Sequence, residues 1–89
     1  MIRVELHGAS RAQYSPLHSL LALHGITDVI VADTGVRYRL PPGEYCYNGN
    51  ATKQQVLTSA KQCAAQIVPA FAVVVTESNG VMWEGLQAA

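Results

Sequence analysis

The sequence has few of the features that mark a secreted, membrane-bound or metal-binding protein. Its two cysteines, Cys46 and Cys63, are too few for a disulfide scaffold or a thiolate zinc site. No apolar run approaches the roughly 18 residues of a membrane span, and the first residues lack the apolar segment of a signal peptide. We therefore expect a cytoplasmic protein that does not enter a membrane and that has no metal or other cofactor.

Charge is scarce and balanced in this chain. Only 13% of the residues are charged, and six lysines and arginines are offset by six acidic residues. Nucleic-acid binders usually carry an excess of basic residues, although a local basic patch is compatible with zero net charge. Since 49% of the 89 residues are hydrophobic, the chain can form one modest core. The sequence has no repeat or linker, so we expect a single domain over residues 1–89.

Five segments have the composition of β-strands. The first alternates strictly between apolar and polar residues, which predicts a strand buried on one face. Residues 33–35, a turn or a bulge, separate the second segment from the third. The Pro-Pro-Gly sequence at 41–43 forces a turn before the fourth segment. The predicted strands are residues 2–7, 28–32, 36–40, 44–48 and 71–76.

Two further segments have helical periodicity and recognisable ends. Ser15, followed by a proline, is a typical helix start, and Gly25 is a typical helix end. Thr52 and Gln55 form a capping-box pattern at the start of a second helix, which stops before Pro69.

The order of these elements is β-α-β-β-α-β, which predicts an α+β ferredoxin-like sandwich with two helices on one face of an antiparallel sheet. Asn79-Gly80 predicts a hairpin turn, and Val81–Trp83 a short additional strand at the C-terminus. The other face of the sheet is expected to be free to meet another molecule.

Three polar side chains are candidates for catalysis. His7, at the end of the first strand, has a side chain that transfers protons near neutral pH, or it is a solvated residue at a strand end. Arg11 lies in a loop before the first helix, where N–H groups and the helix dipole favour a phosphate. Asp33 is either a turn former or a polar catalytic group.

Four residues are candidates for RNA binding. Arg37 and Arg39 share one strand face, and Tyr45 and Tyr47 lie on the next predicted strand. Guanidinium groups beside aromatic rings hold the backbone of single-stranded RNA and stack its bases. The same composition is also common on an ordinary exposed β-surface.

One stretch of the chain also matches a family pattern. Its sharpest part is the segment 31–33, Val-Ala-Asp, followed by Gly35, Val36 and Leu40, and weaker similarity extends from the first strand to about Val75. Through these residues the chain resembles the GhoS family, small endoribonuclease antitoxins of type V toxin–antitoxin systems. The resemblance implies a ferredoxin-like fold, related to the CRISPR adaptation nucleases, and metal-independent cleavage of a toxin messenger RNA.

The chain departs from this family at several polar positions. The first strand ends in His7 where the family has an aspartate, and the first helix has apolar residues at 20–22 where the family has basic ones. The basic side chain that follows the glycine in the family is shifted here to Arg37 and Arg39. Only Asp33 matches a polar family position directly.

Three hypotheses about function follow. In the first, a ribonuclease antitoxin holds single-stranded RNA with its two strand arginines, while His7, with Asp33 or Arg11, assists proton transfer at the ribose 2′-hydroxyl. In the second, the chain is a non-catalytic interaction or regulatory module of a phage or bacterial accessory locus, and it forms a homodimer through residues 71–76 and 81–83. Neutral charge and the lack of an evident acid–base pair favour this hypothesis. The third is a small-molecule sensor, for which no motif is present.

Overall fold

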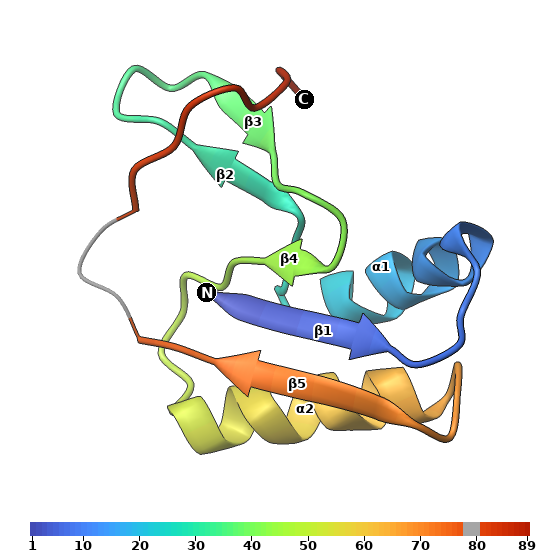
Figure 1. The fold of residues 1–89 in the computed structure, drawn as a ribbon. Helices are drawn as coiled ribbons and strands as arrows, with labels where there is room; N and C mark the ends of the chain where they lie inside the picture. The colour runs from blue at the N-terminus through green and yellow to red at the C-terminus, as the bar shows by residue number, and fades with distance from the viewer. Residues whose placement is uncertain (78–80) are drawn as a thin grey trace.

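The first strand, β1 (Ile2–Leu6), is the centre of a three-stranded antiparallel sheet in the computed structural model, which describes residues 1–77 and 81–89. β5 (Phe71–Val75) pairs with one side of β1, and the short strand β4 (Glu44–Tyr45) pairs with the other (Figure 1). The buried and exposed residues of β1 alternate, as its sequence pattern predicts.

The second and third strands form a separate hairpin instead of joining this sheet. In the part of the chain that the structure describes, β2 (Val29–Val31) and β3 (Arg37–Arg39) pair as strands only with each other. An isolated bridge from Thr27 to Cys46 links the hairpin to the chain after β4. The hairpin is closed by a tight turn in which the Gly35 N–H donates to the Ala32 carbonyl at 2.8 Å. Of the two alternatives at 33–35, the structure therefore has the turn.

The described residues contain two α-helices, and only the second begins with a side-chain cap. α2 (Lys53–Ala65) begins with the predicted capping box, in which the Thr52 hydroxyl accepts from the Gln55 N–H at 3.1 Å. α1 (Tyr14–Ala22) begins before the predicted Ser15, because a short 3-10 helix over Arg11–Gln13 leads directly into it. Among the described residues, no helix has both the length and the apolar character needed to cross a membrane.

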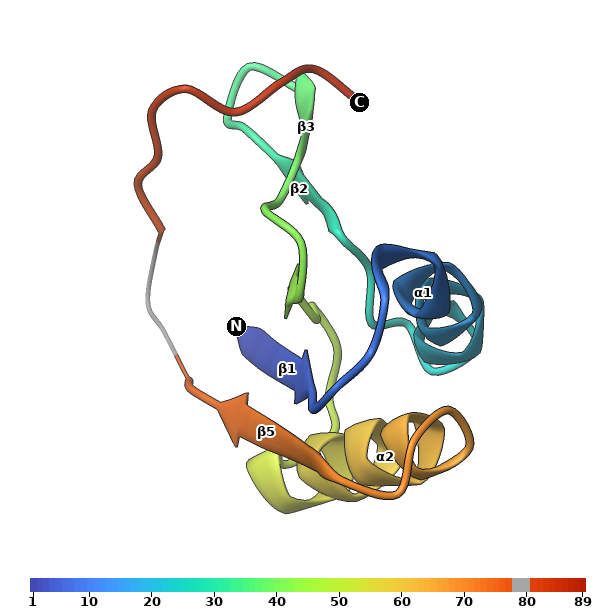
Figure 2. The ribbon, with the colours of Figure 1, turned by 45° about the vertical axis from the view of Figure 1, so that its right-hand side comes forward.

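Both helices lie on the same side of β1 and β5, as Figure 2 shows. The side chains of β1 that point to this side pack with residues of both helices. The buried core residues are Ile2, Val4, Leu6, Leu17, Leu21, Ile26, Tyr45, Val56, Ala60, Cys63, Ala64 and Val68. The opposite face of the sheet is exposed at Arg3, Glu5, Ala72 and Val74. Over residues 1–77 and 81–89 the protein is thus an α+β fold with two α-helices and five strands in antiparallel sheets.

The C-terminal segment does not form the predicted strand. Val81–Trp83 has no strand structure, and the predicted Asn79-Gly80 turn lies outside the described residues. The last residues instead run along the free edge of β3, where the Arg39 N–H donates to the Gln87 carbonyl at 2.9 Å and the Ala89 N–H donates to the Arg37 carbonyl at 3.0 Å. The strand-like pairing of the C-terminus is therefore with β3 and involves residues after the predicted strand.

Candidate functional site

A cleft of about 250 Å³ lies between α1 and the segment around β3. One wall consists of side chains from α1 and the short 3-10 helix, at the spacing i, i+3, i+4 and i+7 that places residues on one face of a helix. The other wall comes from Asp28, the end of β3 and the two prolines after it. The lining residues are Arg11, Tyr14, Ser15, His18, Asp28, Arg39, Leu40, Pro41 and Pro42.

Asp28 connects the two walls of this cleft. Arg39 Nη1 donates to Asp28 Oδ2 at 3.0 Å, and His18 Nδ1 lies 3.8 Å from the same oxygen. The Asp28 side chain is 19% exposed, whereas the Arg39 side chain is 58% exposed. The carboxylate therefore fixes the guanidinium at the cleft while leaving most of its N–H groups open to a ligand.

The cleft has a positive formal charge even with His18 neutral. Arg11 and Arg39 contribute two positive charges, and Asp28 contributes one negative charge. A net charge of this sign, carried by guanidinium groups, favours a phosphate or another oxyanion.

Tyr45 lies beneath the cleft and is completely buried, at 0% exposure. Its ring meets the His18 ring edge to face, with centroids 5.3 Å apart. Burial raises the pKa of the Tyr45 phenol well above its usual value, and the nearby Asp28 carboxylate and Tyr14 add to this shift. The phenol is therefore neutral over the whole physiological pH range.

Two buried polar atoms in this cluster lack a hydrogen-bond partner. Within residues 1–77 and 81–89, the only buried side-chain nitrogen or oxygen atoms without a partner are His18 Nε2 and the Tyr45 hydroxyl. Leaving such an atom unpaired costs about 1–3 kcal/mol, so it is rare in a folded protein. That both atoms occur beside one cleft is typical of a functional site.

The three predicted catalytic residues do not come together. His7 is exposed at the end of β1, and its Nε2 lies 3.7 Å from Glu5 Oε1. Asp33 lies in the segment between β2 and β3, which Figures 1 and 2 place in a different part of the molecule from the end of β1. Of the three, only Arg11 lines the cleft.

The four predicted RNA-binding residues are also divided. Arg39 lines the cleft, and Arg37 is exposed at the other end of the same short strand. Tyr45 is opposite Ile2 on the face covered by the helices, so its ring is packed in the core and is not presented to RNA bases. Tyr47 is partly buried, and its hydroxyl accepts from the Ala51 N–H at 3.3 Å.

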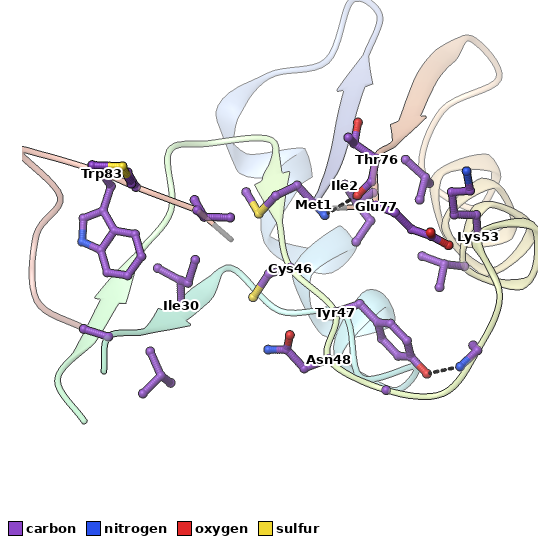
Figure 3. Close-up of a pocket in the computed structure, with 18 of the residues that line it drawn as sticks. Met1, Ile2, Ile30, Cys46, Tyr47, Asn48, Lys53, Thr76, Glu77 and Trp83 are labelled. Carbon is purple, nitrogen blue, oxygen red and sulfur yellow. Dashed lines mark hydrogen bonds between the residues drawn. The ribbon is translucent and has the colours of Figure 1, made fainter. Parts of the chain in front are cut away.

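Asp33 and Tyr47 line a second, larger cavity of about 1170 Å³ between the hairpin, α2 and the C-terminal segment. Figure 3 shows Lys53 and Tyr47 at one end of this cavity and Ile30 and Trp83 at the other. Its charged and aromatic groups therefore do not all converge on one point, unlike the two arginines, the histidine and the carboxylate of the smaller cleft. The smaller cleft is the better candidate for a site that binds and acts on a polar ligand.

His18 and Asp28 are absent from the site residues predicted from the sequence. The sequence contains a signal for His18 but none for Asp28. Arg11, Tyr14 and His18 recur at helical spacing beside an apolar stripe, which indicates a polar stripe along one side of the helix. The role of Asp28 depends on how α1 packs against the hairpin, and this packing has no local sequence signature.

The chemistry available at the cleft is anion binding and proton transfer. Two guanidinium groups bind a phosphate, and an imidazole next to a carboxylate can act as a general acid or base. In the described part of the chain, no three His, Cys, Asp or Glu side chains gather as a metal site requires. Comparison with protein-family models, curated proteins and solved structures gives no match to this chain. Its function has to be inferred from its own residues.

Proposed function

We propose that this protein is a GhoS-like endoribonuclease that binds single-stranded RNA across the cleft between α1 and β3 and cleaves it there without a metal ion. The observation that carries the proposal is the arrangement of Arg39 and His18 around one Asp28 carboxylate, with Arg11 in the same cleft. The resemblance around residues 31–40 supports it and makes a toxin messenger RNA the expected target.

We propose in addition that the fold is ferredoxin-like. The strand order β4-β1-β5, the antiparallel pairing and the position of both helices on one face support this topology. The bridge between Thr27 and Cys46 supports it as well, because it puts the chain before β2 beside the chain after β4. In this interpretation the β2–β3 hairpin extends from the end of the sheet, beside the cleft.

Arginines hold the RNA backbone in this proposal. Arg39 and Arg11 bind the phosphate in the cleft, and the exposed Arg37 binds a neighbouring phosphate along β3. Asp28 keeps the Arg39 guanidinium in place before RNA binds, which lowers the entropy lost on binding. Three contacts of this kind give modest affinity with a measurable dependence on salt.

The bond-breaking step uses the RNA's own 2′-hydroxyl. Because His18 Nε2 is buried, His18 Nδ1 accepts the proton of this hydroxyl, and the 2′-oxygen forms a bond to the adjacent phosphorus. The bond from phosphorus to the 5′-oxygen breaks, and water donates the proton that this oxygen needs. The products are a 2′,3′-cyclic phosphate and a 5′-hydroxyl end, and the two cleft arginines stabilise the charge on the phosphoryl oxygens.

Cleavage of a labelled single-stranded RNA in the presence of EDTA tests the proposal. His18→Ala is expected to lower the rate by about 100-fold or more, since general acid–base catalysis contributes at least that factor. His24→Ala, at an exposed position after the same helix, is expected to leave the rate unchanged. Melting temperatures of both variants show whether the fold is retained.

His7→Ala separates this proposal from the assignment based on the sequence alone. Because His7 is exposed outside the cleft, its variant should cleave at the wild-type rate. A loss of cleavage in His7→Ala with full activity in His18→Ala would place the reaction elsewhere. If the wild-type protein binds RNA but does not cleave it, the protein is an RNA-binding protein without this activity, and the catalytic proposal is overturned.

A further inference from the structure

The outer edge of β5 has no partner strand in the part of the chain that the structure describes. β5 is last in the order β4-β1-β5, at the margin of the sheet in Figure 1. The His7 N–H donates to the Ala70 carbonyl and the Thr76 N–H to the Met1 carbonyl, so the even-numbered residues of this segment bond to β1. The N–H and C=O groups of Phe71, Val73 and Val75 therefore point away from the sheet.

This edge has none of the usual protection against pairing. Exposed edge strands normally carry a charged residue, a proline or a bulge, which discourages association with another strand. β5 consists of five apolar residues, FAVVV, and pairs with β1 in continuous register from Phe71 to Val75. Val74 is 58% exposed on the open face of the sheet. An edge of this kind is a site for strand addition.

We propose that β5 pairs with β5 of a second copy of this chain, antiparallel, about a two-fold axis through Val73 that is perpendicular to the sheet. Val73 then exchanges hydrogen bonds with the partner's Val73, and Phe71 exchanges them with the partner's Val75. Every outward N–H and C=O group of the strand is satisfied. The two sheets join into one antiparallel sheet, with the helices of both copies on the same face.

The side chains of β5 complement each other in this arrangement. On the face covered by the helices, Phe71 is opposite the partner's Val75, a combination of aromatic and β-branched residues that stabilises antiparallel pairs. Both residues pack against the core but are only partly buried, and pairing covers their exposed part. On the open face, Val74 is opposite the partner's Ala72, so an apolar side chain covers an apolar side chain.

The charges on β1 and the residues that flank β5 favour a second copy in this register. Arg3 is the neighbour of Val74 on β1, and Glu5 is the neighbour of Ala72. Pairing centred on Val73 puts Arg3 of one copy and the partner's Glu5 in the same row of the sheet, with only the two apolar residues between them. These two charges are three strand spacings apart, so their attraction is weak, and the flanking residues fix the register more strongly. A shift by two residues would put Val75 opposite the partner's Pro69, which has no N–H to donate, or Phe71 opposite the partner's Glu77.

Two double variants with the same exposed positions test this interface. Ala72→Glu/Val74→Glu puts glutamates opposite glutamates across the proposed pair, whereas Ala72→Lys/Val74→Glu puts a lysine opposite each glutamate. Light scattering after size exclusion should give twice the chain mass of 9.6 kDa for the wild type and for the Lys/Glu variant. The Glu/Glu variant should give the mass of one chain.

Hydrogen exchange provides a second measurement that does not depend on a variant. In the dimer, the amides of Phe71, Val73 and Val75 should exchange slowly, and dilution to the monomer should speed them at least about tenfold, since edge amides open to solvent have little protection. A monomeric wild type, a dimeric Glu/Glu variant, or loss of the dimer in both double variants would overturn the proposal. Fast exchange at these three amides in a stable dimer would do the same, because the copies would then meet elsewhere.

Discussion

Removing the hydroxyl of Tyr45 should make the protein more stable, although the side chain is completely buried. This hydroxyl has no hydrogen-bond partner among the described residues, and an unsatisfied buried hydroxyl costs about 1–3 kcal/mol. Tyr45→Phe deletes the hydroxyl and keeps the ring that packs against His18. We expect the free energy of unfolding to rise by about 1 kcal/mol, and the melting temperature by about 4–8 °C for a domain of this size.

The same substitution at Tyr14 should have the opposite sign. The Tyr14 hydroxyl accepts a hydrogen bond from the Leu6 N–H at 3.0 Å, at the point where β4 no longer covers β1. Tyr14→Phe leaves this N–H without its acceptor, and we expect it to lower the free energy of unfolding by about 1 kcal/mol. Urea denaturation followed by circular dichroism compares both variants with the wild type.

The gain in the free energy of unfolding from Tyr45→Phe should also depend on pH. Because the pKa of the buried phenol is raised above its ordinary value of 10.0, alkali ionises this tyrosine in the unfolded chain before it does so in the folded protein. The stability associated with the neutral phenol is present below pH 10 and is lost as the pH rises further. At pH 11 the advantage of Tyr45→Phe over the wild type should grow by about 1.4 kcal/mol. An equal loss of stability in both Phe variants, or a difference that does not change with pH, would refute this reasoning.

The remaining predictions concern RNA binding and one turn. The logarithm of the RNA association constant should fall with the logarithm of the salt concentration with a slope of about −2, from three arginines at about −0.7 each. Arg37→Ala and Arg39→Ala should each reduce the slope by about 0.7, while Lys61→Ala, on the exposed side of α2, should not change it. Gly43→Ala should destabilise the fold more than Gly35→Ala: both glycines have positive φ, but only at Gly43 would the new Cβ meet a β1 carbonyl oxygen, at 2.8 Å. Equal melting temperatures of the two glycine variants would show that the backbone strain of a positive φ, which both share, accounts for the whole loss of stability.

Local sequence signals predict the elements of this fold whose stability is local. The alternation of β1 follows from one buried face, and the Thr52 capping box depends on residues only three positions apart. The sequence predicts that the first helix starts at Ser15, because Ser15-Pro16 is a good helix start by itself. The structure begins the helix earlier, after a 3-10 helix held by the Ser10 N–H and the Gln13 side chain, at 2.8 Å.

Tertiary contacts decide the features that the sequence pattern does not contain. The C-terminus pairs with β3, and nothing in the last residues indicates this partner. The cleft depends on Asp28, which lies ten residues after His18 and eleven before Arg39 and meets both only when α1 packs beside the hairpin. His7 was the more conspicuous histidine in the sequence, since it ends a strand, but strand ends are scattered over the surface and only packing shows which of them meet.

Nuclear magnetic resonance of the histidine side chains tests the central claim most directly. A single-stranded oligonucleotide that lacks 2′-hydroxyl groups binds without being cleaved, so its titration reports the position of the nucleic acid alone. The imidazole signals of His18 should shift as the oligonucleotide is added, together with the guanidinium signal of Arg39, while the signals of His7 stay in place. Shifts at His7 with unchanged signals at His18 would contradict the assignment of the cleft as the RNA site.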